Sequence, residues 1–497
     1  MFSVLMIKPR WSGEIGFMHP ITPPLGLLYL AAFARQERPG SYVFKIVDER
    51  LDQPDLRQWN HILEEFTPDL IAISALNAEA GRTAYLTHLL KAKASHVPIV
   101  LGGPYPTSVG RAALDRTLAD LLVVGEGEIA FLEILDHVAQ KSPDANNLND
   151  INIPGVLSRS NASLKEHEHA DVVVDMDELP YPAFDLLDLE RYYHSPRMTP
   201  LDTSARYLPL CTSRGCPYNC IYCYNKTFGR RFRAMSAIRI VNEIEHLIDE
   251  YGVHDFEVFD DIFNMPKQRV LEICGEISKR GLKTRFSFPS IRGDILDPDV
   301  ITALKSVGTY FMGIAVESAS NRIQKMIHKN LDLDLVARNI ETTASSGIIT
   351  AGLFMLGFPT ETRQEVWKTI RFALDSRLHM AFFFIVTAFE GTELYEMLEK
   401  SGRIENNRFD EIHDFQYARH SLSEYVSPLQ LSLIQSAGNL LFYMNPIRAL
   451  RILRDYPVSR KELLKIALGF GMQVSFFKPM ALLDKRVHVH GFSLTKS

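Results

Sequence analysis

The chain alternates twice between short apolar runs and amphipathic segments with helical spacing. In its first part, the apolar runs that predict strands lie at 2–9, 42–49, 70–76, 98–107 and 120–124. Segments that predict helices separate these runs, at 23–36, 59–70 and 82–94, and one more follows the fifth run. Strands that alternate with helices form βαβ units and hence a parallel sheet. We therefore expect residues 1–145 to form an α/β domain.

Glycines stand at the ends of the last two predicted strands of this domain. Gly102 and Gly103 follow the fourth run, and Gly125 and Gly127 follow the fifth. In open parallel sheets, ligands bind at the carboxyl ends of the strands. Glycine lets the backbone approach a flat ligand closely. The glycines therefore indicate a ligand site, and tight turns are the alternative interpretation.

The same alternation returns between residues 201 and 425. Six apolar runs predict strands, at 207–213, 254–263, 283–292, 310–318, 349–359 and 379–389. Helical segments such as 236–252 and 298–308 lie between them. Six βα units predict a second parallel sheet. As in full barrels, its catalytic groups should sit at the carboxyl ends of the strands.

Three of the five cysteines fall within eight residues, at Cys216, Cys220 and Cys223. Five cysteines are too few for a disulfide framework, so metal or redox chemistry explains the group better. Thiolates select zinc, Cu(I) or iron–sulfur clusters. A zinc site needs a fourth ligand, and no histidine lies between 195 and 253, so a zinc knuckle is the weaker alternative. Cys211 and Cys274 are expected in the core.

The spacing Cys-x3-Cys-x2-Cys resembles the cysteine motif of radical S-adenosylmethionine (SAM) enzymes. A strand before it, Gly215 at the turn, Tyr222 beside the last cysteine and basic residues at 230–233 strengthen this resemblance. It implies a partial (β/α)6 barrel and a [4Fe-4S] cluster on Cys216, Cys220 and Cys223. Three thiolates leave one iron of the cluster open, and the amino and carboxyl groups of SAM can bind there.

The resemblance also implies which strand ends meet SAM. Asp260 and Asp261 would face its amino group, with a helix N-cap as the alternative. Ser290 and Arg292 end the third strand, where the arginine could hold the carboxylate or ribose or pair with an acid. The remaining candidates are Glu317 for the ribose or carboxylate, Gly357 and Pro359 for the adenine (or a structural turn), and Thr387 with Glu390 at the last strand. Family members often have Pro-Gly-Thr where this chain has Glu390-Gly-Thr.

The first domain resembles the Rossmann-like cobalamin-binding domain found in front of many radical SAM enzymes. The residues that carry this resemblance, and that would line cobalamin, are Ser74, Leu76, Gly102, Gly103, Gly125 and Glu126; 23–26 matches as well. The Asp-x-His-x-x-Gly motif, whose histidine ligates cobalt, is absent from the loop after the first strand. His19 is the only histidine in that loop, so we expect no histidine ligand. A domain without cobalamin is the alternative.

The other segments are less informative. Residues 146–200 are expected to be a linker with a small hairpin, and 426–497 a helical region. Residues 441–490 hold nine Lys or Arg against three Asp or Glu, which permits peripheral membrane contact or a cap on the barrel with a solvated basic face. The net charge of −6 gives no reason to expect nucleic acid. We expect no signal peptide or spanning helix, and a cytoplasmic location.

Together these resemblances imply a cobalamin-dependent radical SAM enzyme. Its cofactors would be a [4Fe-4S] cluster, SAM and cobalamin, with a reductant such as flavodoxin or ferredoxin. A 5′-deoxyadenosyl radical would take hydrogen from an unactivated carbon of a small or lipid-like substrate, and methylcobalamin would supply a methyl group. The first alternative is oxidation without methyl transfer, as in the anaerobic magnesium-protoporphyrin ester cyclase. The second is a non-catalytic metal-binding protein with a relic site.

Overall fold

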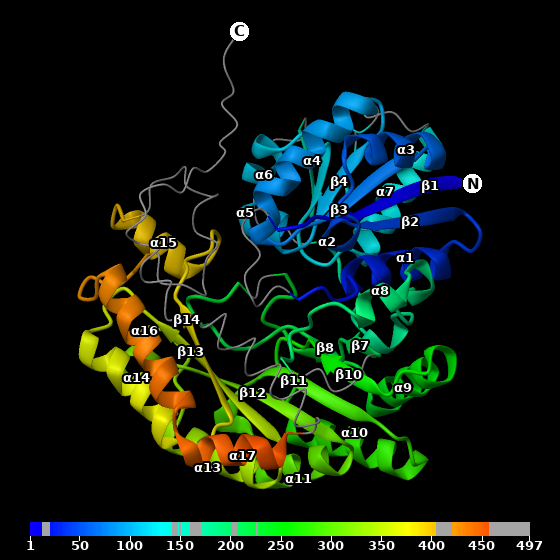
Figure 1. The fold of residues 1–497 in the computed structure, drawn as a ribbon. Helices are drawn as coiled ribbons and strands as arrows, with labels where there is room; N and C mark the ends of the chain where they lie inside the picture. The colour runs from blue at the N-terminus through cyan, green and yellow to red at the C-terminus, as the bar shows by residue number, and fades with distance from the viewer. Residues whose placement is uncertain are drawn as a thin grey trace.

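Two α/β bodies, one above the other in Figure 1, make up the protein. The computed structural model describes residues 1–11, 20–141, 148, 151–159, 170–200, 206–224, 227–403 and 420–456. His19 and most of the predicted basic tail lie outside the described residues. Among the described residues, no helix has the length and apolarity needed to span a bilayer.

The first body is built on a six-stranded sheet in the order β2-β1-β3-β4-β5-β6. Strands β1 to β5 pair in parallel, which confirms the predicted α/β domain, and β6 pairs with β5 in the antiparallel direction. The sixth strand comes from the predicted linker. The strands are β1 (Phe2–Lys8), β2 (Tyr42–Asp48), β3 (Leu70–Ser74), β4 (Ile99–Gly102), β5 (Leu121–Val123) and β6 (Val156–Ser158).

Helices cover both faces of this sheet. Side chains of a strand alternate between its faces, so Val4 and Met6 pack under α1 and α7, whereas Leu5 and Ile7 pack under α3 and α4. The helices are α1 (Leu25–Glu37), α2 (Glu49–Asp52), α3 (Leu56–Phe66), η1 (Asn77–Glu79), α4 (Ala80–Lys93), α5 (Pro104–Val109), α6 (Arg111–Arg116) and α7 (Glu128–Lys141).

Short elements connect the two bodies and add to the core. Phe184 is 1% exposed and belongs to the same hydrophobic cluster as the two sheets. The connecting elements are η3 (Met176–Glu178), η4 (Phe184–Leu186) and α8 (Leu189–Tyr193).

The second body holds an open parallel sheet in the order β14-β13-β12-β11-β10-β7. The six predicted strands are confirmed, and the described residues contain no pairing of β7 with β14 that would close a barrel. The strands are β7 (Tyr207–Leu210), β10 (Asp255–Val258), β11 (Arg285–Ile291), β12 (Thr309–Glu317), β13 (Ile349–Leu356) and β14 (Met380–Ile385); a small hairpin of β8 (Ser213–Arg214) and β9 (Arg233–Ala234) follows β7.

The helices of this body begin and end at the residues that their sequence favours. For example, the Oγ of Ser236 accepts a hydrogen bond from the backbone N–H of Arg239 at the start of α9, and Gly252 ends it with φ +63°. The helices are α9 (Ala237–Tyr251), α10 (Lys267–Arg280), η5 (Gly293–Ile295), α11 (Pro298–Ser306), α12 (Asn321–Met326), α13 (Leu333–Ser345), α14 (Arg363–Asp375) and α15 (Glu393–Lys400).

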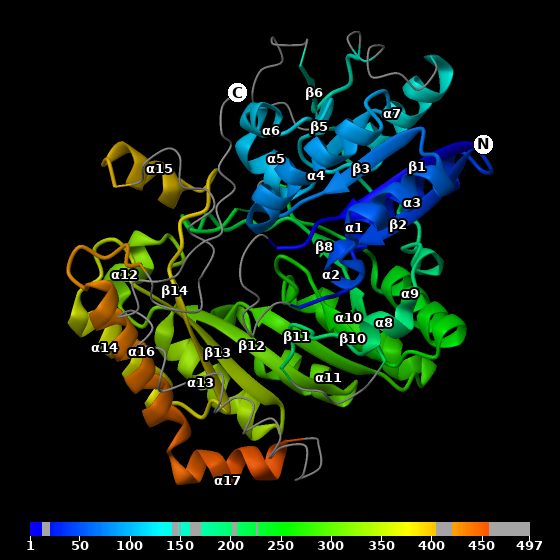
Figure 2. The same ribbon diagram turned by 45° about the horizontal axis from the view of Figure 1, so that its top comes forward.

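Two helices follow this sheet, α16 (Pro428–Tyr443) and α17 (Pro446–Asp455). Helix α16 packs on α14, and α17 lies at the end of the sheet away from the first body (Figures 1 and 2). Arg448 anchors α17: its buried guanidinium donates to the carbonyl oxygens of Leu378, Phe442 and Ser376 at 2.9–3.0 Å. The described start of the predicted helical region is therefore attached to the barrel.

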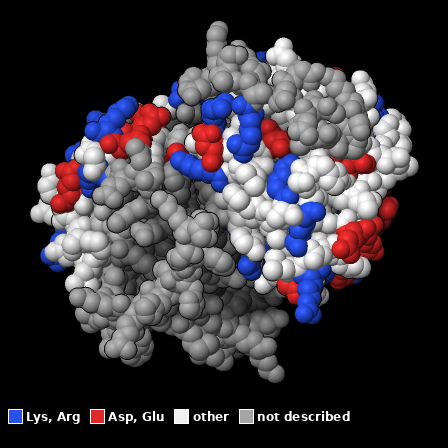
Figure 3. All heavy atoms as spheres, turned by 90° about the horizontal axis from the view of Figure 1, so that it is seen from above, with Lys and Arg blue, Asp and Glu red and all other residues white. Residues whose placement is uncertain are grey.

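On the face that Figure 3 shows, described basic and acidic side chains are intermixed. That distribution agrees with the modest net charge.

Candidate active site

The carboxyl ends of the two parallel sheets meet between the bodies (Figures 1 and 2). The hydroxyl of Tyr224, in the cysteine loop, donates to the carbonyl oxygen of Thr107 in α5 at 2.6 Å. Arg116, at the end of α6, pairs with Glu390, which follows β14, at 2.7 Å. The strand ends that the sequence singles out in each body therefore border one shared space.

The three clustered cysteines lie on the cysteine loop between β8 and β9, whose described residues are 215–224 and 227–232. The two short strands pair with Arg214 opposite Arg233. Gly215 opens the loop with φ +83°, and a Cβ at this position would lie 2.4 Å from the carbonyl oxygen of Arg231. Glycine is required here because both the backbone conformation and the space exclude a side chain.

The three thiols form no disulfide and are close enough to affect one another's ionisation. Burial raises the pKa of each thiol, and a negative charge on Cys220 adds to the rise at Cys216 and Cys223. Within the described ranges, no three His, Cys, Asp or Glu converge as ligands of one metal ion. A four-iron cluster does not need such convergence, because its cysteine thiolates bind different irons. The donor set fits such a cluster better than a single zinc ion.

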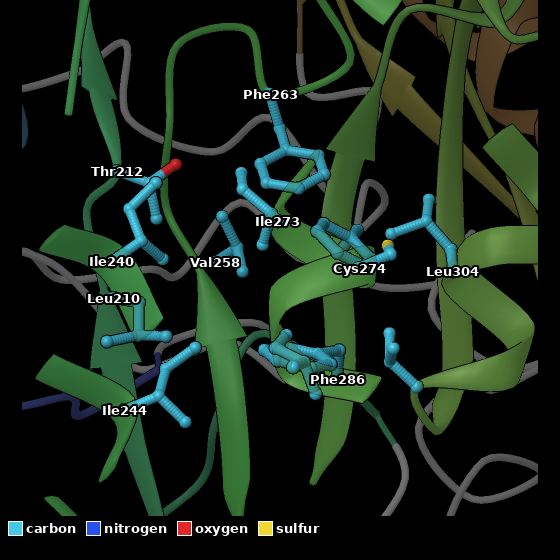
Figure 4. Close-up of a pocket in the computed structure, with 13 residues that line it drawn as sticks. Leu210, Thr212, Ile240, Ile244, Val258, Phe263, Ile273, Cys274, Phe286 and Leu304 are labelled. Atoms are coloured by element: carbon cyan, nitrogen blue, oxygen red, sulfur yellow. The ribbon is translucent and has the colours of Figure 1, made fainter. Parts of the chain in front are cut away.

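Of the two remaining cysteines, Cys274 is in the core, as the sequence predicts, whereas Cys211 is only partly buried against it. Cys274 is 3% exposed and lines a cavity among apolar side chains of β7, β10, β11 and α9 to α11 (Figure 4). Cys211 packs against the same cluster, and its Sγ lies 3.5 Å from the carbonyl oxygen of Ser213. Burial raises the pKa of both thiols to about 12.

Asp260 and Asp261, after β10, have different partners. The carboxylate of Asp260 accepts from the backbone N–H and the hydroxyl of Thr212 and from the hydroxyl of Ser213, each at 2.6 Å. Asp261 is exposed and accepts from the backbone N–H of Gly215 at 3.1 Å. Asp260 thus ties β10 to the start of the cysteine loop, and Asp261 is the better candidate for an ammonium group.

Arg292, after β11, braces the cysteine loop. Its guanidinium pairs with Asp294 at 2.7 Å, donates to the carbonyl oxygen of Lys329 at 2.8 Å and lies 3.7 Å from the ring centre of Tyr218. This arrangement agrees with the sequence alternative in which the arginine pairs with an acid. Ser290, the other candidate on this strand, is exposed.

Glu317, at the end of β12, belongs to a network that the sequence did not reveal. Its carboxylate accepts from the Nζ of Lys329 at 2.8 Å and from the hydroxyl of Tyr222 at 3.2 Å. Lys329 also lowers the pKa of Cys220, against the effect of burial. The network therefore places a buried ammonium beside the cysteine loop. Lys329 carried no motif in the sequence, since only its position in the fold distinguishes it.

Gly357 and Pro359 belong to a turn after β13. Like Lys329, the residue that closes this turn, Glu361, was not singled out in the sequence. Glu361 accepts from the backbone N–H of Gly357 at 2.7 Å and from that of Phe358 at 3.2 Å. The ring of Phe358 lies 6.1 Å from that of Tyr222, so the turn borders the cysteine loop. A carboxylate four residues after a strand-end glycine was the available sequence signal.

Glu361 is expected to make stability depend on pH. Burial raises its pKa from 4.5 to about 8, so the folded protein keeps a proton that the unfolded chain releases between those values. Stability should therefore fall as pH rises through this window, by up to about 1.4 kcal/mol per pH unit. Urea unfolding at pH 5 to 8 should show this slope in the wild type and a flatter one in Glu361→Gln. Equal slopes in the two proteins would contradict the assignment.

The predicted cobalamin residues gather at the carboxyl edge of the first sheet. Ser74 and Gly102 are neighbours across β3 and β4. Gly103 has φ +92°, and a Cβ there would lie 2.9 Å from the Oγ of Ser74. Leu76 is 37% exposed at the same edge. The backbone N–H of Gly125 donates to the Oγ1 of Thr107 at 3.0 Å. Glycine is required at position 103 by its backbone conformation and by the close packing of Ser74 and Ala75, which agrees with the tight-turn alternative; the corrinoid site at this edge stays a prediction.

Glu126 and Glu390 face the other body. Glu126 is buried, and its carboxylate pairs with Arg214 at 2.6 Å and also with Arg233. Glu390, which replaces the family's proline, pairs with Arg116, and its carbonyl oxygen accepts from the side-chain amide of Asn77 at 3.4 Å. Both contacts join residues far apart in the chain, which no local pattern could predict. Thr387, beside Glu390, is buried.

A buried ion pair closes the turn after β3. Lys8, at the end of β1, pairs with Glu79 at 2.6 Å, and Glu79 also accepts from the backbone N–H of Leu76 at 2.8 Å. These two residues were not singled out in the sequence. They support the turn that carries two of the predicted cobalamin contacts.

Two known domain families match the chain in the order that the fold suggests. Residues 18–135 match the B12 binding domain, and residues 210–373 match the Radical SAM superfamily. An uncharacterized methyltransferase of Pyrococcus horikoshii is 29% identical over 90% of this chain and 93% of its own length.

More distant relatives have assigned reactions. The anaerobic magnesium-protoporphyrin IX monomethyl ester cyclase of Rubrivivax gelatinosus is 23% identical over 94% of this chain and 81% of its own. The hopanoid C-3 methylase of Methylococcus capsulatus is 26% identical over 84% of this chain and 78% of its own length. Among solved structures, the radical SAM methyltransferase TsrM from Kitasatospora setae, with cobalamin and a [4Fe-4S] cluster bound, has a TM-score of 0.63 and 17% identity over 81% of this chain and 75% of its own. At that identity, the likeness shows the fold.

Proposed function

The chain belongs to the family of cobalamin-dependent radical SAM methyltransferases, and on this premise we propose that it methylates an unactivated carbon of a small or lipid-like substrate. One observation carries the proposal: the loop with three cysteines outside any disulfide faces the glycine turns of the first domain across a hydrogen bond of 2.6 Å from Tyr224 to Thr107. A substrate between the two bodies would be close to both predicted cofactor sites.

The residues of the chain would bind, orient and shield the reactants. When bound, the cluster and SAM supply a carbon-centred radical, and cobalamin supplies the methyl group. Cys216, Cys220 and Cys223 would hold the cluster, and Asp261 the SAM ammonium. Glu317, which accepts a hydrogen bond from Lys329, would bind the ribose or carboxylate of SAM.

The SAM adenine and the corrinoid would rest on glycine-containing strand ends. Gly357 and Pro359 would border the adenine. The turns at Ser74, Leu76 and Gly103 would hold the corrinoid. Gly125 would line the same site, whereas Glu126 would support the turn through its arginine partners.

Two alternatives remain distinct from this proposal. An oxidative cyclase would use the same cofactors without methyl transfer. The cyclase relative favours it, but two of the three named relatives are methyltransferases. A relic metal-binding protein would not cleave SAM, and the intact triplet of cysteines, none of them in a disulfide, argues against it.

The test uses the full chain, reconstituted without oxygen with iron, sulfide and hydroxocobalamin and then desalted. Iron and cobalt per chain are measured, and SAM cleavage is assayed with dithionite. We expect roughly four irons and one cobalt, together with 5′-deoxyadenosine. Iron without cobalt would favour a non-methylating radical reaction, and zinc in place of iron would refute the proposal. In the cell, the electron would come from a cytoplasmic flavodoxin or ferredoxin.

The surface of α16 and α17 supports contact with an anionic lipid membrane. Residues 427–455 contain three arginines and one acid, Asp455, which pairs with Arg454. Arg448 is buried, so Arg451 and Arg454 supply the basic side chains of this surface. Exposed apolar side chains follow one another along the two helices, at Leu429, Leu433, Leu441, Met444, Ile447, Leu450 and Leu453. Apolar side chains beside arginines are typical of helices that lie on anionic lipid. A membrane-resident substrate would agree with the hopanoid relative.

We expect the protein to sediment with vesicles that contain phosphatidylglycerol and less with purely zwitterionic ones. Leu450→Glu should weaken this binding by about ten-fold, because a buried leucine contributes roughly 1.5–3 kcal/mol. Ile238→Glu is the matched control, since Ile238 is 62% exposed on α9, far from the two helices. Equal sedimentation of the two variants would contradict the membrane surface.

A further inference from the structure

The loop with the three cysteines is closed by a carboxylate from the other body of the protein. Its ends are Arg214 and Arg233, which face each other across β8 and β9. Glu126 binds both: one carboxylate oxygen accepts from Arg214 at 2.6 Å, and the other accepts from Arg233. The two guanidinium groups are thus joined through one residue of the B12-binding domain.

The surroundings make this junction a buried one. Glu128 accepts from the second terminal nitrogen of Arg214 at 2.7 Å, and the side chains of all four charged residues are at most 7% exposed. Two arginines face two glutamates, so the charges balance. In such a setting, the removal of one partner leaves the others uncompensated.

The local secondary structure is too small to close the loop alone. Strands β8 and β9 have two residues each, and the three cysteines lie between them. Short two-stranded hairpins are marginal without further packing. Inside the loop, the backbone N–H of Cys216 donates to the carbonyl oxygen of Gly229 at 3.3 Å. The contact with Glu126 therefore supplies closure that the hairpin lacks.

A second contact reaches the loop near its last cysteine. Tyr224, next to Cys223, donates its hydroxyl to the carbonyl oxygen of Thr107. The hydroxyl of Thr107 donates to the carbonyl oxygen of Gly103 at 2.8 Å and accepts from the backbone N–H of Gly125. The turns predicted to meet cobalamin are thus connected to the cysteine loop by hydrogen bonds.

We propose that the B12-binding domain is a structural part of the cluster site, and that Glu126 is a positioning residue that keeps the cysteine loop closed. The inference rests on the proposed cluster. Glu126 acts through Arg214 and Arg233, which it binds at the two ends of the loop. Loss of its charge should open the base of the loop, and the cluster should then be released faster and show an altered environment.

The test compares Glu126→Gln with Glu49→Gln in full-length reconstituted protein. Glu49 is the matched control, because its side chain is fully buried in the same domain and its ion pair with Arg82 lies within that domain. Cluster loss to an iron chelator is followed by absorbance, and the reduced cluster is examined by electron paramagnetic resonance. We expect about ten-fold faster loss or more and a changed spectrum in Glu126→Gln, with wild-type values in Glu49→Gln.

Wild-type cluster kinetics and spectrum in Glu126→Gln would overturn the inference, and so would equal changes in both variants. If Glu126→Gln does not fold, Tyr224→Phe decides, because it removes one hydroxyl at the other contact. We expect Tyr224→Phe to keep its unfolding temperature and to lose the cluster about two- to five-fold faster; an unchanged rate overturns the inference. A wild type that binds no iron would instead refute the proposed function.

Discussion

Cys220→Ser is expected to abolish the cluster and all reductive cleavage of SAM. The chain has only two cysteines outside the loop, Cys274, which is buried in the core, and Cys211, which packs against it, so neither is expected to replace a lost ligand. A hydroxyl is a poor ligand for iron that prefers thiolate. Iron content, the absorbance of the cluster and the yield of 5′-deoxyadenosine measure the effect, and we expect all three at background after anaerobic reconstitution.

Cys274→Ser is the matched control for this prediction. It removes a thiol from the same body but from a buried position beneath the sheet (Figure 4). We expect a stability loss of about 1–3 kcal/mol, because the hydroxyl would be buried in an apolar setting, and a normal cluster. A normal cluster in Cys220→Ser, or a missing one in Cys274→Ser, would refute the assignment of the ligands.

Gly103→Ala is expected to prevent the retention of cobalamin and to leave the iron content unchanged. Alanine is strained at φ +92°, and its Cβ would lie 2.9 Å from the Oγ of Ser74 and 3.0 Å from the carbonyl oxygen of Ala75. Such strain costs about 1–3 kcal/mol, and relief of the contacts must separate the ends of β3 and β4. Because this edge is the predicted corrinoid site, binding should weaken about ten-fold or more.

Cobalt retained after desalting, together with the absorbance of the corrinoid, measures that loss. Gly275→Ala provides the control: it lies in α10, its Cβ would meet nothing within 4 Å, and alanine favours a helix by about 1 kcal/mol. Full cobalt retention in Gly103→Ala would move the corrinoid site away from this edge.

The features that could be predicted from the sequence are those that depend on a local pattern of residues. Apolar runs such as 310–318 mark buried parallel strands, because both faces of such strands are covered, and β12 is buried along its whole length. The three cysteines were evident because their spacing is short. The candidate residues at strand ends follow from the rule that parallel strands present their carboxyl ends together.

Long-range contacts could not be predicted in this way. Glu126 was expected to line cobalamin, but its carboxylate partners, Arg214 and Arg233, lie 88 and 107 positions further along the chain. Glu390 and Arg116 are separated by 274 positions. Such pairs depend on how the two bodies dock, which leaves no periodic signal in either segment.

Backbone conformation around Lys329 has a consequence for attempts to make this protein more heat-resistant. Its neighbours His328 and Asn330 have φ of +56° and +51°, and its partner Glu317 has φ of +63°. Each residue other than glycine that adopts the left-handed conformation costs the folded state roughly 1 kcal/mol. Glycine at positions 328 and 330 would therefore relieve strain in the folded backbone. The same change would give the lysine freedom to leave the carboxylate. Substitutions at 328 and 330 that raise thermal stability would therefore loosen the alignment of the Lys329 ammonium with Glu317.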